Sequence, residues 1–147
     1  MTKLSEDLFS PAGKLAIEEA IKVAEQSTSA EIRVFIEETT QGQNELMRAG
    51  EMFHTLKMDA TEAQSGVLIY LAVLDRKFAI IGDKGIHEKV GGEYWNSVRD
   101  AMQTQFRLTH FTQGVIDAIH KCAEVMVSHY PRGENDENEL SDEVIYG

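Results

Sequence analysis

The sequence contains one cysteine, no apolar run long enough to cross a membrane, and few basic residues. The single cysteine, Cys122, excludes an internal disulfide. The N-terminal residues lack the apolar core of a signal peptide, so we expect a cytoplasmic protein without a membrane span. The chain has 25 Asp and Glu against 14 Lys and Arg, a net charge of −11. This balance argues against nucleic-acid binding, because phosphate contacts require a basic face.

Several signatures of catalysis are also missing. The histidines and the cysteine show no spacing typical of a zinc site. Ser65 precedes a glycine but lies in no GxSxG elbow. The turn Gly82–Gly85 (GDKG) lacks the spacing and the GK[ST] ending of a phosphate-binding Walker loop. The residues therefore indicate no organic cofactor and no complete catalytic constellation.

The strongest structural signal that is present is a pair of apolar runs near the middle of the chain. Val67–Leu74 is continuously apolar, which is typical of a strand buried on both faces. Phe78–Ile81 follows after a short polar turn, so the two runs predict an antiparallel hairpin. Glu31–Glu37 (EIRVFIE) alternates and predicts an earlier strand. A helix predicted over 44–57 makes the connection from this strand to Val67–Leu74 a right-handed βαβ unit.

Helices are predicted to cover this sheet. Apolar residues recur at helical spacing over 11–26, 93–108 and 112–130, besides 44–57. These elements predict an α/β fold, a three-layer α/β/α sandwich over 1–132 with a small mixed sheet and about four main helices. The segment 133–147 holds six carboxylates and no basic residue. It predicts a disordered acidic tail, which could tether a basic partner.

Segments at and around these strands are similar to those of a known family. TSAEIRV (Thr28–Val34), SGVLIYLA (Ser65–Ala72), FAIIGDKGIHEKVG (Phe78–Gly91) and FTQGVIDAIH (Phe111–His120) resemble the TPM domain, and in particular its short, soluble bacterial branch. The resemblance implies a compact α/β/α fold. It also implies two candidate activities, since divalent-cation binding is associated with some members and acid phosphatase activity with at least one plant member. The chain departs from the family at Ser65, where Asn is expected before the glycine.

Strand direction places several carboxylates at one edge of the predicted sheet. Because the first two strands are parallel, their carboxyl ends bring together Glu37, Glu38 and Asp75, and the first helix brings Asp7 toward the same edge. Open α/β sheets bind ligands outside the carboxyl ends of their strands, and carboxylate oxygens suit Ca²⁺ or Mg²⁺. The pattern predicts a metal site of Asp7, Glu37, Glu38 and Asp75. The alternative is that these acids are solvated groups at the ends of elements.

The opposite edge collects the residues of the family-like motifs. Glu31, Ser65, Asp83 and His87 converge there, because the third strand runs antiparallel to the other two. The glycines of the GDKG turn would let backbone amides approach a ligand closely. We therefore predict a ligand-binding groove at this edge. The alternative is that these are turn glycines, with Asp83 capping its own loop.

Two functions remain open from the sequence. The leading prediction is a TPM-type binding or accessory domain without catalysis of its own, with Ca²⁺ or Mg²⁺ as a candidate ligand and an unidentified protein as a candidate partner. The alternative is a weak metal-dependent acid phosphatase, in which either Asp75 acts as the nucleophile, with Arg76 pairing with the incoming phosphate, or a metal-activated water attacks. Asp75 and Arg76 also fit an ordinary polar hairpin turn.

Overall fold

A computed structural model describes residues 4–61, 63–133 and 143–147. The elements follow one another as α1 (Leu4–Asp7), α2 (Pro11–Glu25), β1 (Ile32–Glu37), α3 (Glu45–Thr55), the 3₁₀ turn η1 (Met58–Ala60), β2 (Val67–Ala72), β3 (Lys77–Gly82), α4 (Lys84–Val90), α5 (Gly92–Arg107), α6 (Phe111–His129) and β4 (Ile145–Tyr146).

The four strands form one mixed sheet in the order β3-β2-β1-β4. β1 pairs in parallel with β2, with Ile32 opposite Val67 and Glu37 opposite Ala72. β2 and β3 form an antiparallel hairpin in which Ala72 lies opposite Lys77. The predicted parallel pair and the predicted hairpin are therefore both confirmed.

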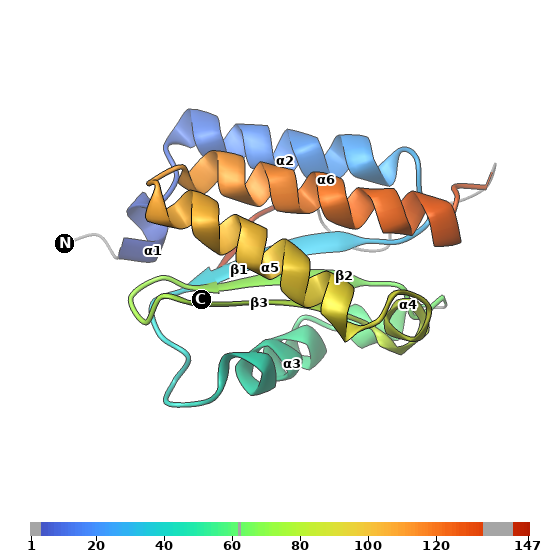
Figure 1. The fold of residues 1–147 in the computed structure, drawn as a ribbon, viewed down its shortest axis with the longest axis horizontal. Coiled ribbons are helices and arrows are strands. Elements are labelled where there is room, and N and C mark those ends of the chain that lie inside the picture. Colours follow the sequence, from blue (N-terminus) through green and yellow to red (C-terminus); the bar gives the residue numbers. More distant parts are fainter. Residues whose placement is uncertain (1–3, 62, 134–142) are drawn as a thin grey trace.

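Helices cover both faces of the sheet and give the predicted three layers. α2, α5 and α6 lie on one face and α3 lies on the other (Figure 1). The larger core lies beneath the three helices and includes Ile17, Trp95 and Ile119. A smaller core beneath α3 includes Phe53 and Tyr70. Within the described residues six α-helices are present, because the short α1 and α4 add to the four long helices that were predicted.

Local signals explain where the covering helices begin. The Gly13 N–H donates to Ser10 Oγ at 3.0 Å, and Pro11 occupies the first turn of α2. Asn44 Oδ1 accepts from the Leu46 N–H at 2.8 Å and so caps α3. No helix within the described residues is long and apolar enough to span a lipid bilayer.

The end of the chain differs from the predicted disordered tail. Residues 143–147 are ordered against the domain, and β4 adds to the sheet in parallel with β1, with Phe35 opposite Ile145. Val144 is buried in the larger core, and its N–H donates to Glu18 Oε2 at 3.0 Å. The prediction is wrong for these residues because a two-residue strand is too short to show alternation beside an acidic run. The rest of the predicted tail, 134–142, lies outside the described residues.

Candidate functional site

The carboxyl end of β1 holds a buried ion pair. The Glu37 side chain is 4% exposed, and Arg48 of α3 contacts both of its oxygens, with Nε to Oε2 at 2.8 Å and Nη2 to Oε1 at 2.9 Å. The Tyr70 hydroxyl, from the neighbouring strand, also donates to Oε2. Glu37 therefore has a bidentate cationic partner and a neutral donor, the arrangement that compensates a buried carboxylate.

The electrostatics of this group favour charged Glu37 and neutral Tyr70. Burial alone would raise the pKa of Glu37, but the hydrogen bonds from Arg48 and Tyr70 and the charge of Arg48 outweigh it, so this pKa lies below its ordinary value. Burial, followed by donation to the anionic Glu37, raises the pKa of Tyr70. The bonds to Glu37 raise the pKa of Arg48. Arg48 also pairs with Glu51, Nη1 to Oε1 at 2.8 Å, so these side chains form a structural cluster at the end of β1.

The other predicted metal ligands have separate partners. Glu38 Oε1 accepts from the Ser5 N–H at 2.7 Å and so fastens α1 to the end of β1. Asp75 Oδ2 accepts from the Thr40 N–H at 2.9 Å and from Thr40 Oγ1 at 3.3 Å. Within the described residues no group of three or more His, Cys, Asp or Glu side chains is arranged to hold a metal. The structure thus places Asp7, Glu37, Glu38 and Asp75 around this edge without uniting them in one ligand set.

Beside these acids lies a cavity of about 600 Å³. Its walls come from α1, from the hairpin between β2 and β3, from α5, and from the connection that leads into α6. Phe106 forms part of its aromatic wall, with ring centroids 4.9 Å from Phe78 and 5.6 Å from Phe111. Val73 and Leu8 extend the apolar surface. The cavity therefore combines an apolar interior with an opening at the carboxyl edge of the sheet.

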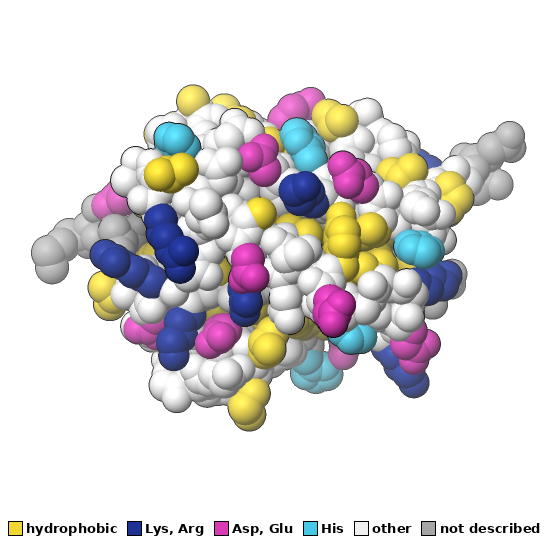
Figure 2. Space-filling model, in the orientation of Figure 1, with side chains coloured by type: hydrophobic (Ala, Val, Ile, Leu, Met, Phe, Trp, Pro, Cys, Tyr) yellow, Lys and Arg dark blue, Asp and Glu magenta, His cyan; other side chains and the backbone are white. Residues whose placement is uncertain are grey.

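Two arginines from distant parts of the sequence stand at this cavity. Arg76 lies in the hairpin, in the left-handed backbone region with φ of +53°, and Arg107 ends α5. Both side chains are exposed, and neither has an ion-pair partner within the described residues. Figure 2 shows Lys and Arg side chains gathered at the end of the molecule that carries the hairpin and the α5–α6 connection, on the left of the view. Asp and Glu side chains lie among them, so this edge carries charges of both signs (Figure 2).

The four residues of the predicted groove at the opposite edge of the sheet differ in burial. Glu31 and Ser65 are buried, whereas His87 is exposed on α4. Asp83 is the N-cap of α4, and its Oδ1 accepts from the Lys84 N–H at 2.7 Å. A Cβ at Gly85 would lie 2.8 Å from the carbonyl oxygens of residues 63 and 64, so the α4 backbone fills this space. Asp83 thus caps its own helix, as the alternative expected, while Glu31 and Ser65 are buried and His87 lies on the surface, and the ligand-binding groove stays a prediction.

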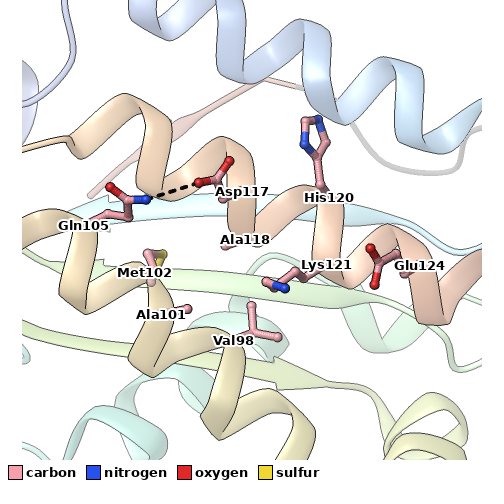
Figure 3. A pocket seen from close by; sticks show the side chains of 9 residues that line it. All are labelled: Val98, Ala101, Met102, Gln105, Asp117, Ala118, His120, Lys121 and Glu124. Atoms are coloured by element: carbon pink, nitrogen blue, oxygen red, sulfur yellow. Dashed lines mark hydrogen bonds between the residues drawn. The ribbon is translucent and has the colours of Figure 1, made fainter.

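A smaller cavity, about 310 Å³, lies between α5 and α6. Figure 3 shows Val98 and Met102 facing α6, while His120 points away from them toward α2. Asp117 accepts from Gln105 Nε2 at 3.4 Å and from Gln113 Nε2 at 2.7 Å. Acidic and basic side chains alternate along this cavity, so it presents no concentrated charge of either sign.

Sequence reasoning did not identify Arg48, Tyr70 or Arg107. A signal for the first two was available, because Phe35 and Glu37 share one face of β1 by alternation, and α3 covers that face. An end-of-strand carboxylate on a covered face needs a cation from the covering helix. No comparable signal places Arg107 beside the hairpin, because that proximity depends on how α5 crosses the sheet.

Proteins of known structure share this fold. The solution structure of BA42 from the psychrophilic bacterium Bizionia argentinensis is similar over the whole length of both chains, with 41% identity and a TM-score of 0.88. The N-terminal domain of cg2496 from Corynebacterium glutamicum shares the fold at 13% identity and a TM-score of 0.54, over 87% of this chain and 77% of that one. Among curated proteins none matches. The family model of the TPM domain matches residues 3–125, and the chain therefore belongs to the TPM domain family.

Proposed function

We propose that this TPM domain is a binding module whose ligand occupies the 600 Å³ cavity at the carboxyl edge of the sheet. The observation that supports this proposal is the cavity itself. Its volume is within the range of about 300–1,000 Å³ that small-molecule sites have. It lies outside the carboxyl ends of the parallel strands β1 and β2, where open α/β sheets bind their ligands. Its lining combines five apolar side chains with five polar or charged ones, and the polar groups can fix the orientation of a bound molecule.

A divalent cation is a further proposed ligand at the same edge. Asp75 and Glu38 each accept a backbone N–H hydrogen bond on one carboxylate oxygen, which leaves the other oxygen to a hard cation. Asp7 lies on the cavity wall, but within the described residues it forms no group of three carboxylates arranged to hold a metal, so we propose Glu38 and Asp75 as the protein ligands. Glu37 is excluded from this set, because Arg48 and Tyr70 already occupy both of its oxygens.

A titration of ¹⁵N-labelled protein tests the binding module. Small amphipathic compounds of negative, neutral and positive charge are added separately, followed by Ca²⁺ and Mg²⁺. We expect saturable shifts of the amides of Val73, Phe78 and Phe111 with at least one organic compound, and shifts at Glu38 and Asp75 with a cation. Amides of the α5–α6 cavity serve as the internal control. If no compound produces a saturable shift at the carboxyl edge, the proposed function is wrong.

A metal-dependent acid phosphatase is the second candidate, favoured by the anchoring of Asp75. Thr40 holds Asp75 Oδ2, and the adjacent Arg76 lines the cavity that would receive a phosphate. In this mechanism a carboxylate oxygen of Asp75 would attack phosphorus while the bond from phosphorus to the alcohol oxygen breaks and the alcohol leaves; water would then hydrolyse the aspartyl phosphate, which releases inorganic phosphate and restores Asp75. A cation held at this edge would supply positive charge to offset that of the phosphate. We expect Asp75→Asn to abolish Mg²⁺-dependent hydrolysis of p-nitrophenyl phosphate, with Asp100→Asn as an exposed control. A wild-type rate equal to the buffer blank would exclude this candidate for that substrate.

A further inference from the structure

We propose that the ligand of the carboxyl-edge cavity is a single-chain amphipathic carboxylate. In this assignment the guanidinium groups of Arg76 and Arg107 hold the carboxylate, and the rings of Phe78, Phe106 and Phe111 receive the apolar chain. The assignment rests on the proposed function, because it specifies what that binding module binds.

The arginines provide the first argument. Arg76 comes from the hairpin and Arg107 from the end of α5, yet both line one cavity. No ion pair within the described residues uses either guanidinium. Arg48 and Arg99, by contrast, each form an ion pair with a carboxylate. Two unpaired planar cations at one opening suit an anion that accepts two hydrogen bonds from a guanidinium, as a carboxylate does.

The charge of the cavity distinguishes a monoanion from a polyanion. Asp7 lies on the same wall as the two arginines, so the lining carries two positive charges and one negative charge. A carboxylate neutralises the remaining positive charge. A phosphate monoester carries nearly two negative charges at neutral pH, and its second charge would meet Asp7 without a matching cation. The lining therefore favours the carboxylate.

The apolar surface around the arginines favours a ligand in which an apolar chain is attached to the carboxylate. The three phenylalanine rings form a continuous wall, with neighbouring centroids 4.9 Å and 5.6 Å apart. Leu74 and Leu108 are 61% and 58% exposed, and they lie next in sequence to the cavity residues Val73 and Arg107. Phe78 and Phe106 are only 9% and 7% exposed, so the apolar surface that is open to water belongs mainly to Phe111, Leu8 and the flanking Leu74 and Leu108. An inorganic anion would leave that surface in contact with water, whereas an alkyl chain would cover it, and each buried CH₂ would contribute about 0.8 kcal/mol.

Octanoate is the probe that tests the assignment, with 1-octanol, octylammonium and inorganic phosphate as matched compounds. We expect octanoate to bind the full chain with saturable shifts of the Val73, Phe78 and Phe111 amides. Arg76→Gln and Arg107→Gln are each expected to weaken octanoate about tenfold, because each removes a hydrogen bond to a charged group. Asp7→Asn is expected to strengthen binding by removing a like charge.

Arg99→Gln is the control for the arginine variants, since it makes the same charge change on α5 but lies outside the cavity lining. It should leave the octanoate affinity unchanged. Thermal unfolding of every variant checks that each one is folded. Octanol binding as tightly as octanoate, or octanoate binding unaffected by both arginine changes, would overturn the carboxylate assignment and leave the binding module standing. Phosphate binding without octanoate binding would also overturn it, in favour of a small-anion site. If none of the four compounds reaches the cavity, the proposed function itself fails.

Discussion

Methionine in place of Arg48 is expected to lower the free energy of unfolding by about 3–5 kcal/mol, the usual cost of removing one partner of a buried ion pair. Arg48 is 14% exposed and Glu37 is 4% exposed, so the change leaves a carboxylate in the protein interior with no cation on the oxygens that Arg48 contacted. Methionine keeps most of the side-chain length, so lost packing contributes little. Urea unfolding of the variant and the wild type measures the difference.

A double-mutant cycle separates the ion pair from the rest of the packing. Adding Glu37→Gln to Arg48→Met removes the stranded charge, so we expect the double variant to be more stable than Arg48→Met alone. Arg99→Gln is the exposed comparison, since its partner Asp100 is 64% exposed, and it should cost at most about 1 kcal/mol. A loss of less than about 1 kcal/mol in Arg48→Met would contradict the buried-pair interpretation.

The same cluster is expected to make the folded protein less stable at acid pH. The pKa of Glu37 is lower in the folded protein than its ordinary value of 4.5, so the folded state favours the charged form. Its contribution to stability is therefore complete above about pH 4.5 and is lost as the pH falls through the folded-state pKa. We expect Glu37→Gln to remove this part of the acid dependence. An identical acid slope in wild type and variant would contradict it.

The carboxyl edge shows what strand order can and cannot predict. The parallel pair and the hairpin follow from apolar runs and turn residues, and they correctly bring the ends of β1 and β2 to one edge. The direction of the strands alone suggested that Glu37, Glu38 and Asp75 would share a site. Alternation along β1 instead turns Glu37 toward α3, beside Phe35 and Tyr70, where Arg48 binds it.

The cavity depends on contacts between residues that are far apart in the sequence. Arg76 follows from the hairpin, but its proximity to Arg107 depends on the path of α5 across the sheet. Asp83 is a different case, because capping depends on residues adjacent in sequence and could be anticipated. Long-range neighbours thus account for the arginine cavity, and short-range ones for the α4 cap.

Ending the chain after Gly133 is expected to lower the free energy of unfolding by about 2–3 kcal/mol. The truncation removes Val144 from the larger core, which alone is worth about 1.5–3 kcal/mol. It also removes two long-range hydrogen bonds, from the Val144 N–H to Glu18 and from the Gly147 N–H to the Ile36 carbonyl. The entropy of ordering this segment offsets part of these gains. Urea unfolding of the truncated and complete chains measures the effect.

Substitutions of valine distinguish the contribution of the Val144 side chain from that of chain length. Val144→Ala keeps the whole chain and should reproduce about 1 kcal/mol or more of the loss by removing buried methyl groups. Val127→Ala, at a 37% exposed position on α6, is the matched control and should have a much smaller effect. Truncation also uncovers the outer edge of β1, so self-association of the shortened protein should increase. Equal stability of the truncated and complete chains would mean that residues 143–147 do not belong to the cooperative fold.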